Sequence, residues 1–138
     1  MSMLLDIFDP NTWLPPPHEY RIYLDNNAHN YAIVDEIDYY WAIEWRWNIK
    51  RCRRLKEYAR RAISTYHEGG ERKGSQTIYL HIEIMKKTGK QPPTVFHIMV
   101  DHRNGKSLDC RRHNLRWATP RMNTMNLHGQ MAYDLIEG

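Results

Sequence analysis

The sequence has few cysteines and no long apolar run. Charged residues interrupt every hydrophobic stretch of the 138-residue chain before it reaches the roughly 18 apolar residues of a membrane helix, which excludes a helical membrane protein. Only Cys52 and Cys110 occur, so cysteine alone builds neither a disulfide framework nor a four-cysteine zinc site, and we expect two free thiols. The first eight residues lack a basic segment and an A-x-A cleavage site. We therefore expect no secretory signal and a cytoplasmic location.

The net charge of +4 is unevenly distributed along the chain. Residues 1–45 hold one basic and eight acidic residues, whereas residues 46–73, which include Arg53 and Arg54, hold ten basic and three acidic ones. Such a concentration of Lys and Arg favours a phosphate backbone as partner, and binding of this kind weakens steeply with salt. A solvated protein face without a partner is the alternative.

Residues 1–75 divide into an arm and a small basic α/β region. Three prolines at 15–17 favour an extended conformation, so we expect an arm over residues 1–19. Within residues 20–75 the patterns predict a hairpin of strands at 20–25 and 31–35 and further strands at 47–52 and 58–65. Between them, the four-residue spacing of Ile37, Trp41 and Trp45 predicts a short amphipathic helix with the two tryptophans in the core.

Residues 76–138 carry clearer start and stop signals. We expect a strand at 76–80, a helix over 81–88 ended by Gly89, and a β-rich run at 94–101. A polar loop with Gly105 in its turn then leads to a return strand at 115–118 and a helix that begins at Pro120 and runs to about residue 127 or 128. The fold class is therefore α+β, and this last unit is strand, long loop, strand and helix.

Four polar residues of this unit suit the hydrolysis of a phosphodiester bond. Asp101 and Asn123 offer hard oxygen ligands for Mg²⁺, which keeps several waters and is often completed by phosphate oxygens. A neutral His102 can take a proton from an attacking water. Asn114 completes the set, and nearby arginines match phosphate geometry. Taken singly, each residue is more often an ordinary turn or surface residue, and neighbours such as Asp101 and His102 point to opposite faces of a regular strand.

The combined spacing of these residues resembles a known module. The segments V-D-H-R-N-G at 100–105, L-D-C-R-R-H-N-L-R-W-A-T at 108–119 and N-T-M-N at 123–126 closely resemble the HNH endonuclease module, in the homing type of phages and introns whose final His is replaced by Asn. Upstream, L-H-I-E-I-M at 80–85 is similar to the family's L-H-R-E-I-M. The likeness is strong over 95–126 and weak before 76. Two departures are Ile82, where the family usually has Arg, and Cys110, where it usually has Asn.

The resemblance implies a ββα-metal (HNH) finger in residues 76–138 and a one-metal mechanism. His102 would be the general base, Asp101 and Asn123 would bind a single divalent cation, Mg²⁺ or Mn²⁺, and Asn114 would organise the loop and hold the imidazole. Because the chain has no paired CxxC motifs, Leu115, Trp117 and apolar residues of 76–100 would brace the finger in place of zinc. Candidates for contacts to double-stranded DNA are Arg53, Arg54, Arg111, Arg112, Arg116 and Arg121.

Three functions follow as hypotheses. The leading one is a metal-dependent DNA endonuclease in a bacterial or phage-infected cell, acting as a monomer or a homodimer. The second is a DNA-binding protein that retains the finger with weak or no catalysis, to which the charge of residues 46–73 and the 12 residues after Asn126 point. The third is an interaction module of a phage packaging or defence complex, suggested by the acidic, aromatic N-terminal segment and its proline arm.

Overall fold

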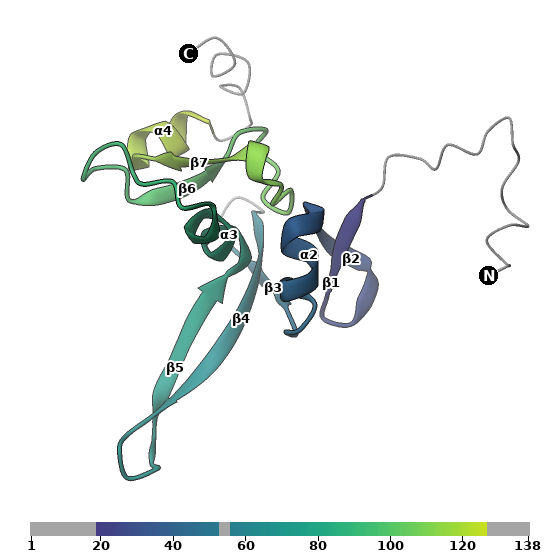
Figure 1. The fold of residues 1–138 in the computed structure, drawn as a ribbon, viewed down its shortest axis with the longest axis vertical. Coiled ribbons are helices and arrows are strands. Elements are labelled where there is room, and N and C mark those ends of the chain that lie inside the picture. The colour runs from purple at the N-terminus through teal and green to yellow at the C-terminus, as the bar shows by residue number, and fades with distance from the viewer. Residues whose placement is uncertain (1–18, 53–55, 127–138) are drawn as a thin grey trace, which may run out of the picture.

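The computed structural model describes residues 19–52 and 56–126, which form a mixed α+β fold of three antiparallel sheets and short helices (Figure 1). The first sheet pairs β1 with β2, the second has the order β3–β4–β5, and the third pairs β6 with β7. The expected α+β class with antiparallel strands is therefore confirmed. Within the described residues no helix is long and apolar enough to cross a membrane.

The first hairpin joins β1 (Tyr20–Leu24) to β2 (Asn27–Val34). Its turn consists of Asp25 and Asn26, whose φ angles are 54° and 53°. A two-residue turn with both φ angles positive matches the twist of the strands, and Asp and Asn tolerate that conformation better than other residues with a side chain. The expected hairpin is confirmed, and its second strand begins earlier than expected, at Asn27.

Helix α2 (Glu36–Ala42) forms where the sequence predicts it but buries a different face. Ile37 is 66% exposed and Trp45 is 50% exposed, whereas Asp38 and Ala42 are fully buried. Trp41 is partly buried and packs against the core, as expected. The prediction of one buried apolar face is wrong for Ile37 and Trp45, because the helix ends before Trp45 and because buried ion pairing of Asp38 sets the orientation of the helix. The indole of Trp45 instead stacks under the Arg61 guanidinium, 3.9 Å from the ring centre.

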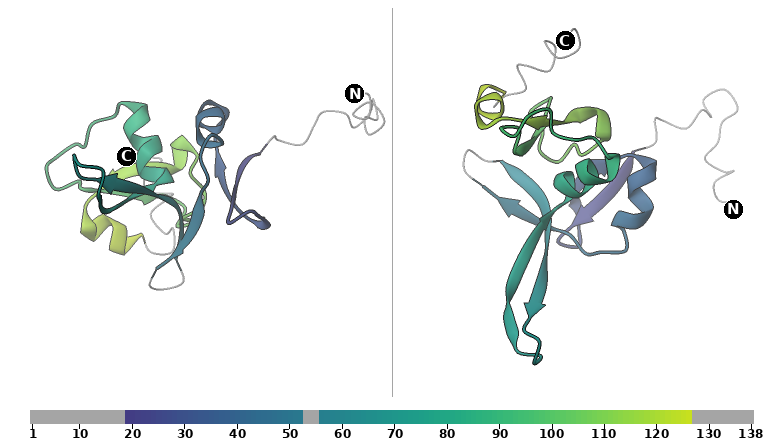
Figure 2. Two further views of the ribbon diagram at one scale, coloured as in Figure 1. Left: turned by 90° about the horizontal axis from the view of Figure 1, so that it is seen from below. Right: turned by 60° about the vertical axis from the view of Figure 1, so that its left-hand side comes forward.

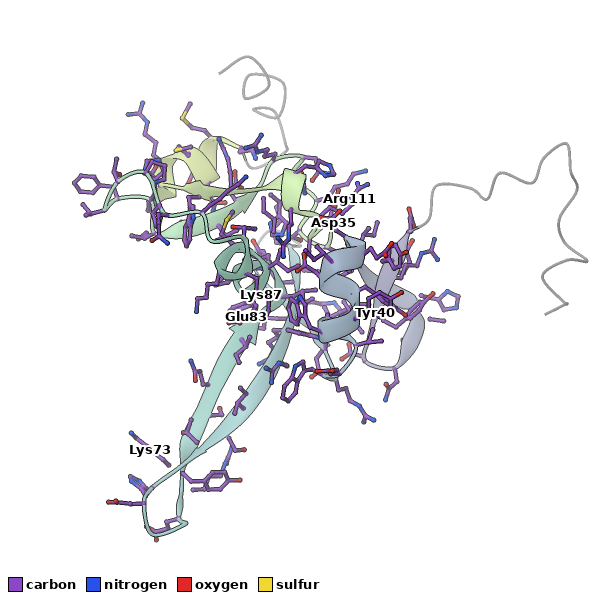
Figure 3. All side chains as sticks on the ribbon, in the orientation of Figure 1. Asp35, Tyr40, Lys73, Glu83, Lys87 and Arg111 are labelled. Carbon is purple, nitrogen blue, oxygen red and sulfur yellow. The ribbon has the colours of Figure 1, made fainter. Side chains whose placement is uncertain are left out.

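The second sheet contains β3 (Asn48–Arg51), β4 (Glu57–Tyr66) and β5 (Arg72–Tyr79). The far halves of β4 and β5 extend from the body as a long two-stranded hairpin, seen in Figures 1 and 2. Lys73 lies near its tip in Figure 3. Ala59, in the part of β4 that lies against the body, belongs to the core, and β5 leads directly into the next helix.

Helix α3 (Leu80–Thr88) follows β5 directly and ends as expected at Gly89, whose φ of 75° suits a left-handed cap. The expected strand over 94–101 is reduced to β6 (Met99–His102). Its partner β7 has only four residues, so residues 94–98 lack a neighbouring strand. Val95, Phe96 and Ile98 are instead 84%, 71% and 69% exposed.

The C-terminal unit has the predicted order of strand, loop, strand and helix. β6 pairs antiparallel with β7 (Leu115–Ala118), and the short 3-10 helix η2 (Arg112–Asn114) precedes β7. Helix α4 (Pro120–Met125) begins behind Thr119, whose hydroxyl accepts a hydrogen bond from the Met122 backbone N–H at 3.1 Å. The expected helix end at 127 or 128 lies outside the described residues.

One hydrophobic core joins the two expected regions. Leu24 and Trp47 from the N-terminal region belong to the same cluster as Leu80, Ile84 and Leu115. The loop between β6 and β7 also docks on β2: the Ile33 N–H donates to the Leu108 carbonyl, and the Cys110 N–H donates to the Ile33 carbonyl, both at 2.8 Å. Apolar packing of α3, β6 and β7, with Trp117 partly buried, therefore braces this unit.

Candidate active site

A small cavity of about 50 Å³ lies where the end of β6, α4 and the start of β4 meet. Asp101 and His102 of β6 and Asn123 of α4 line it together with Lys56, which precedes β4. The rest of its wall comes from Tyr58, Gly105, Ser107 and Asn126. Three of the four residues expected to carry the chemistry thus line one cavity, and Asn114 lies outside its wall.

Asp101 is held by a buried network. Its Oδ2 accepts hydrogen bonds from Arg116 Nε at 3.0 Å and from Asn126 Nδ2 at 2.9 Å, and Arg116 Nη2 lies 2.9 Å from the same oxygen. Register explains the pair, because Asp101 lies directly opposite Arg116 across β6 and β7. Among the described residues none donates a hydrogen bond to Asp101 Oδ1, so that oxygen is available to a ligand.

His102 lies in an aromatic environment on the other side of β6. Its ring centre lies 4.8 Å from that of His81 on α3 and 6.0 Å from that of Tyr58 on β4. Burial lowers the pKa of His102 to about 4, with Lys56 lowering it further and Asp109 opposing the change. The imidazole is therefore neutral at pH 7, and its buried Nε2 has no hydrogen-bond partner among the described residues.

Neighbouring strand residues reach this one cavity from opposite faces. Asp101 points toward Arg116 and Asn126, whereas His102 packs against Tyr58 and His81. Both line the cavity because β6 ends at His102 and the chain then turns through Gly105, whose φ is 75°. The strand end thus allows both side chains to serve one site.

Asn114 organises the loop rather than the imidazole. Its Nδ2 donates to Asn104 Oδ1 at 2.9 Å and to the Asp109 carbonyl at 2.8 Å, and its Oδ1 accepts from the Asn104 N–H at 3.0 Å. Its backbone carbonyl accepts from the Arg103 N–H at 2.7 Å. Within the described residues it makes no hydrogen bond to the His102 side chain, so its expected hold on the imidazole is corrected to a hold on the loop that follows His102.

The two asparagines of α4 have different roles. Asn126, which is 1% exposed, donates from Nδ2 to Asp101 and to the carbonyls of His102 and Arg103. The Asn123 side chain makes no hydrogen bond within the described part of the chain, although its backbone N–H continues the helix. Asn126 therefore stabilises the end of β6, and the Asn123 amide is left available to a ligand in the cavity.

Three of the arginines expected to contact DNA are instead engaged within the protein. Arg116 is 6% exposed and pairs with Asp101, so its expected phosphate contact is corrected to a structural role. Arg112 donates from Nε and Nη2 to the two oxygens of buried Asp38, each at 2.8 Å, and so ties η2 to α2.

Arg111 pairs with Asp109 at 2.8 Å and keeps 40% of its side chain exposed. Figure 3 shows it beside Asp35, whose carboxylate accepts the Arg112 N–H at 2.7 Å. Arg121 is exposed on α4, as a phosphate contact requires. Arg53 and Arg54 lie outside the described residues, so their expected DNA contacts stay predictions.

The donor set in the cavity fits a hard divalent cation. Asp101 Oδ1 and the Asn123 amide oxygen are two oxygen ligands of the kind that Mg²⁺ prefers, and this ion commonly binds through one or two protein ligands while waters and phosphate oxygens fill its other positions. In the described ranges no group of three or more His, Cys, Asp or Glu residues could hold a metal ion.

Sequence reasoning assigned no role to two residues, one in the wall of the cavity and one beside His102. Lys56 lines the cavity and donates to the Gly105 carbonyl, a contact across 49 positions that no local pattern signals. His81 is buried beside His102, and burial lowers its pKa well below the ordinary value. Its place in the L-H-I-E-I-M segment was the available signal for His81.

No family model, curated protein or solved structure matches the chain. The likeness to the HNH module therefore rests on the residues of the sequence alone.

Proposed function

We propose that the protein is a metal-dependent DNA endonuclease whose C-terminal unit is a ββα-metal finger of the HNH type. The observation that carries the proposal is that Asp101, His102 and Asn123 line one small cavity with Lys56. This cavity combines hard oxygen ligands, a neutral base and a cation, which are the groups that phosphodiester hydrolysis requires.

His102 is the general base in this proposal. Its ring is neutral at pH 7 because burial disfavours the charged form, and its Nε2 has no partner within the described residues. A water held in the cavity could pass a proton to such a nitrogen as it attacks phosphorus. Lys56 and the exposed Arg121 supply positive charge for the phosphate backbone.

Asp101 and Asn123 would hold the divalent cation. When bound, an ion such as Mg²⁺ or Mn²⁺ stabilises negative charge on the phosphate oxygens and on the leaving group. Arg116 and Asn126 fix the orientation of the Asp101 carboxylate through its other oxygen. The protein thereby sets the direction of one ligand before any cation binds.

The experiment that tests this proposal is cleavage of a supercoiled plasmid with Mg²⁺, Mn²⁺ or EDTA. Wild type should relax or linearise the plasmid only with metal, and His102→Ala should be slower by about 10²- to 10⁴-fold while binding DNA equally well, since it removes only the base. His29→Ala is a matched control that should retain the rate, because His29 is exposed on β2 and lies outside the cavity. Equal rates for wild type and His102→Ala would show that the assigned mechanism is wrong.

A DNA-binding protein with weak or no catalysis is the second candidate. The favouring observation is that the Asp101 carboxylate already has a cationic partner in Arg116, which reduces its attraction for a second cation. DNA binding without cleavage in any metal would support this candidate.

A further inference from the structure

A second, larger cavity adjoins the candidate active site. It has a volume of about 240 Å³, and we call it the base pocket. Its wall consists of Cys52, Tyr58, Tyr79, His81, Ile82, Ile98, Met99, Val100 and Asn123. Because Tyr58 and Asn123 line both cavities, the base pocket lies directly beside the cavity that holds Asp101 and His102.

Aromatic and aliphatic side chains dominate the base pocket. The ring centres of Tyr58 and Tyr79 are 6.1 Å apart, and they lie 5.3 Å and 5.7 Å from that of His81. Ile82 and Ile98 add apolar surface. Flat rings of this kind bind the π-face that every nucleobase presents, without regard to sequence.

His81 adds a polar group that lacks a partner. Its side chain lines the base pocket, the residue is only 7% exposed, and its Nδ1 has no hydrogen-bond partner within the described residues. A buried nitrogen of this kind costs free energy unless a ligand or a water satisfies it. The edge of a nucleobase carries donors and acceptors that could do so.

The size of the base pocket narrows the choice of ligand. Its volume of about 240 Å³ lies below the roughly 300 Å³ at which cavities for drug-sized ligands begin. A single nucleobase, attached to a phosphate in the neighbouring cavity, suits both the volume and the position. A peptide side chain would meet the same rings but would not place a phosphate beside His102.

We propose that the base pocket receives one nucleobase, unstacked from the DNA, next to the phosphate that enters the Asp101 and His102 cavity. This inference rests on the proposed function, because it places DNA in that cavity. Removing a base from the stack is least costly when the base is mispaired. The protein should therefore bind a duplex with one mismatch more tightly than the matched duplex.

The test measures binding of two labelled duplexes that differ in one mismatched base pair, by fluorescence anisotropy in EDTA so that no cleavage occurs. Wild type should favour the mismatched duplex by about 10-fold, because unpairing and unstacking a base costs a few kcal/mol in a matched duplex and less where the base is mispaired. Tyr79→Ala, which removes a ring, and Ile98→Trp, which fills the base pocket from an exposed position, should both abolish the preference.

Two matched controls separate the base pocket from general effects. Tyr79→Phe retains the ring and should keep the preference. Val95→Trp adds the same side chain at an 84% exposed position of the same loop, outside the base pocket, and should also keep it. Equal binding of both duplexes by wild type would overturn the proposal. A preference that persists in Ile98→Trp would also overturn it, because the introduced indole would then fill the base pocket and the nucleobase would have to bind elsewhere.

The outcome for the base pocket is distinguishable from the outcome for the nuclease. Metal-dependent plasmid cleavage without a mismatch preference would leave the proposed function standing and overturn the base pocket. A mismatch preference that both blocking variants abolish, without cleavage in any metal, would support the base pocket and overturn the nuclease.

Discussion

Replacing Arg116 should destabilise the protein far more than it weakens DNA binding. The Arg116 side chain is 5% exposed and that of Asp101 is 7% exposed, so the ion pair between them is shielded from water. In Arg116→Ala the Asp101 carboxylate loses both contacts at 2.9 and 3.0 Å and keeps the Asn126 amide. A buried charge left without its partner typically costs about 3 to 5 kcal/mol of unfolding free energy.

The assay for this prediction is urea unfolding followed by tryptophan fluorescence. Arg116→Ala should lower the free energy of unfolding by about 3 to 5 kcal/mol, a large part of the roughly 5 to 15 kcal/mol of a typical domain. If that variant does not fold, Arg116→Lys keeps the positive charge and should fold with a smaller loss. Arg121→Ala is the matched control, because Arg121 is exposed and its loss should change the free energy by less than about 0.5 kcal/mol.

A surface role for Arg116 gives the opposite pattern. If Arg116 contacted DNA as the sequence suggested, its alanine variant would unfold at nearly the wild-type urea concentration and would bind DNA with a reduced salt dependence. A loss below about 1 kcal/mol, within the range of exposed ion pairs, would refute the argument from burial.

Three further predictions concern pH, the loop and the DNA-facing charge. Burial lowers the pKa of His102 to about 4, while the unfolded chain binds this proton near pH 6.5. The free energy of unfolding should therefore be highest above about pH 6.5, and protonation of this residue in the unfolded chain should lower it by about 3 kcal/mol as the pH drops to 4. Urea titrations at several pH values check this, and His102→Gln should reduce the dependence without removing it, because burial also lowers the pKa of His81. Asn114→Ala removes three loop hydrogen bonds of a buried side chain and should cost about 3 kcal/mol in urea unfolding, with slower plasmid cleavage because the loop after His102 loosens. Arg121→Ala should reduce the slope of log affinity against log salt by about 0.9, the value for one phosphate contact, as measured by anisotropy titrations.

Each of these outcomes has a result that contradicts it. Unchanged stability between pH 7 and pH 4.5 would mean that His102 is not shielded from water. An Asn114→Ala variant as stable as wild type would mean that its loop contacts are replaceable. An Arg121→Ala variant with the wild-type salt slope would mean that Arg121 contacts no phosphate.

Local signals in the sequence predicted much of the fold. Gly89 ends α3 in the left-handed region, as its position after the helical pattern predicts. The first hairpin also forms, although its turn lies at Asp25 and Asn26, where the sequence predicted a strand end and a turn one residue later. Thr119 and Pro120 start α4 as a capping residue and a first helical residue do. Each of these signals acts between residues that are close in sequence, which is why the pattern alone was enough.

Partners that are distant in sequence explain the errors. Ile37 is exposed because Asp38, on the adjacent face of α2, is held by Arg112 from the C-terminal unit. Residues 94–98 have strand-like composition but no strand to pair with. Lys56 enters the candidate site through a contact to Gly105 that follows only from the packing of β4 against the loop. Of the four predicted site residues, three line the cavity, and Asn114 bonds the loop as the motif implied but makes no hydrogen bond to the His102 side chain within the described residues.

The same distant pairs change which charges can face DNA. Arg112 and Arg116 are matched by the buried carboxylates of Asp38 and Asp101, so they add little to the field outside the protein. The number of basic residues in the motif therefore overstates the affinity of this unit for a phosphate backbone. A guanidinium that is already paired and buried does not neutralise a phosphate, so it releases no counterion from DNA on binding. Among the described residues of the site, Lys56 in the cavity wall and Arg121 on α4 are better placed to meet phosphate. The arginines of the motif thus divide into Arg112 and Arg116, which pair with buried carboxylates inside the protein, and Arg121, which is exposed and would meet phosphate in the proposed function.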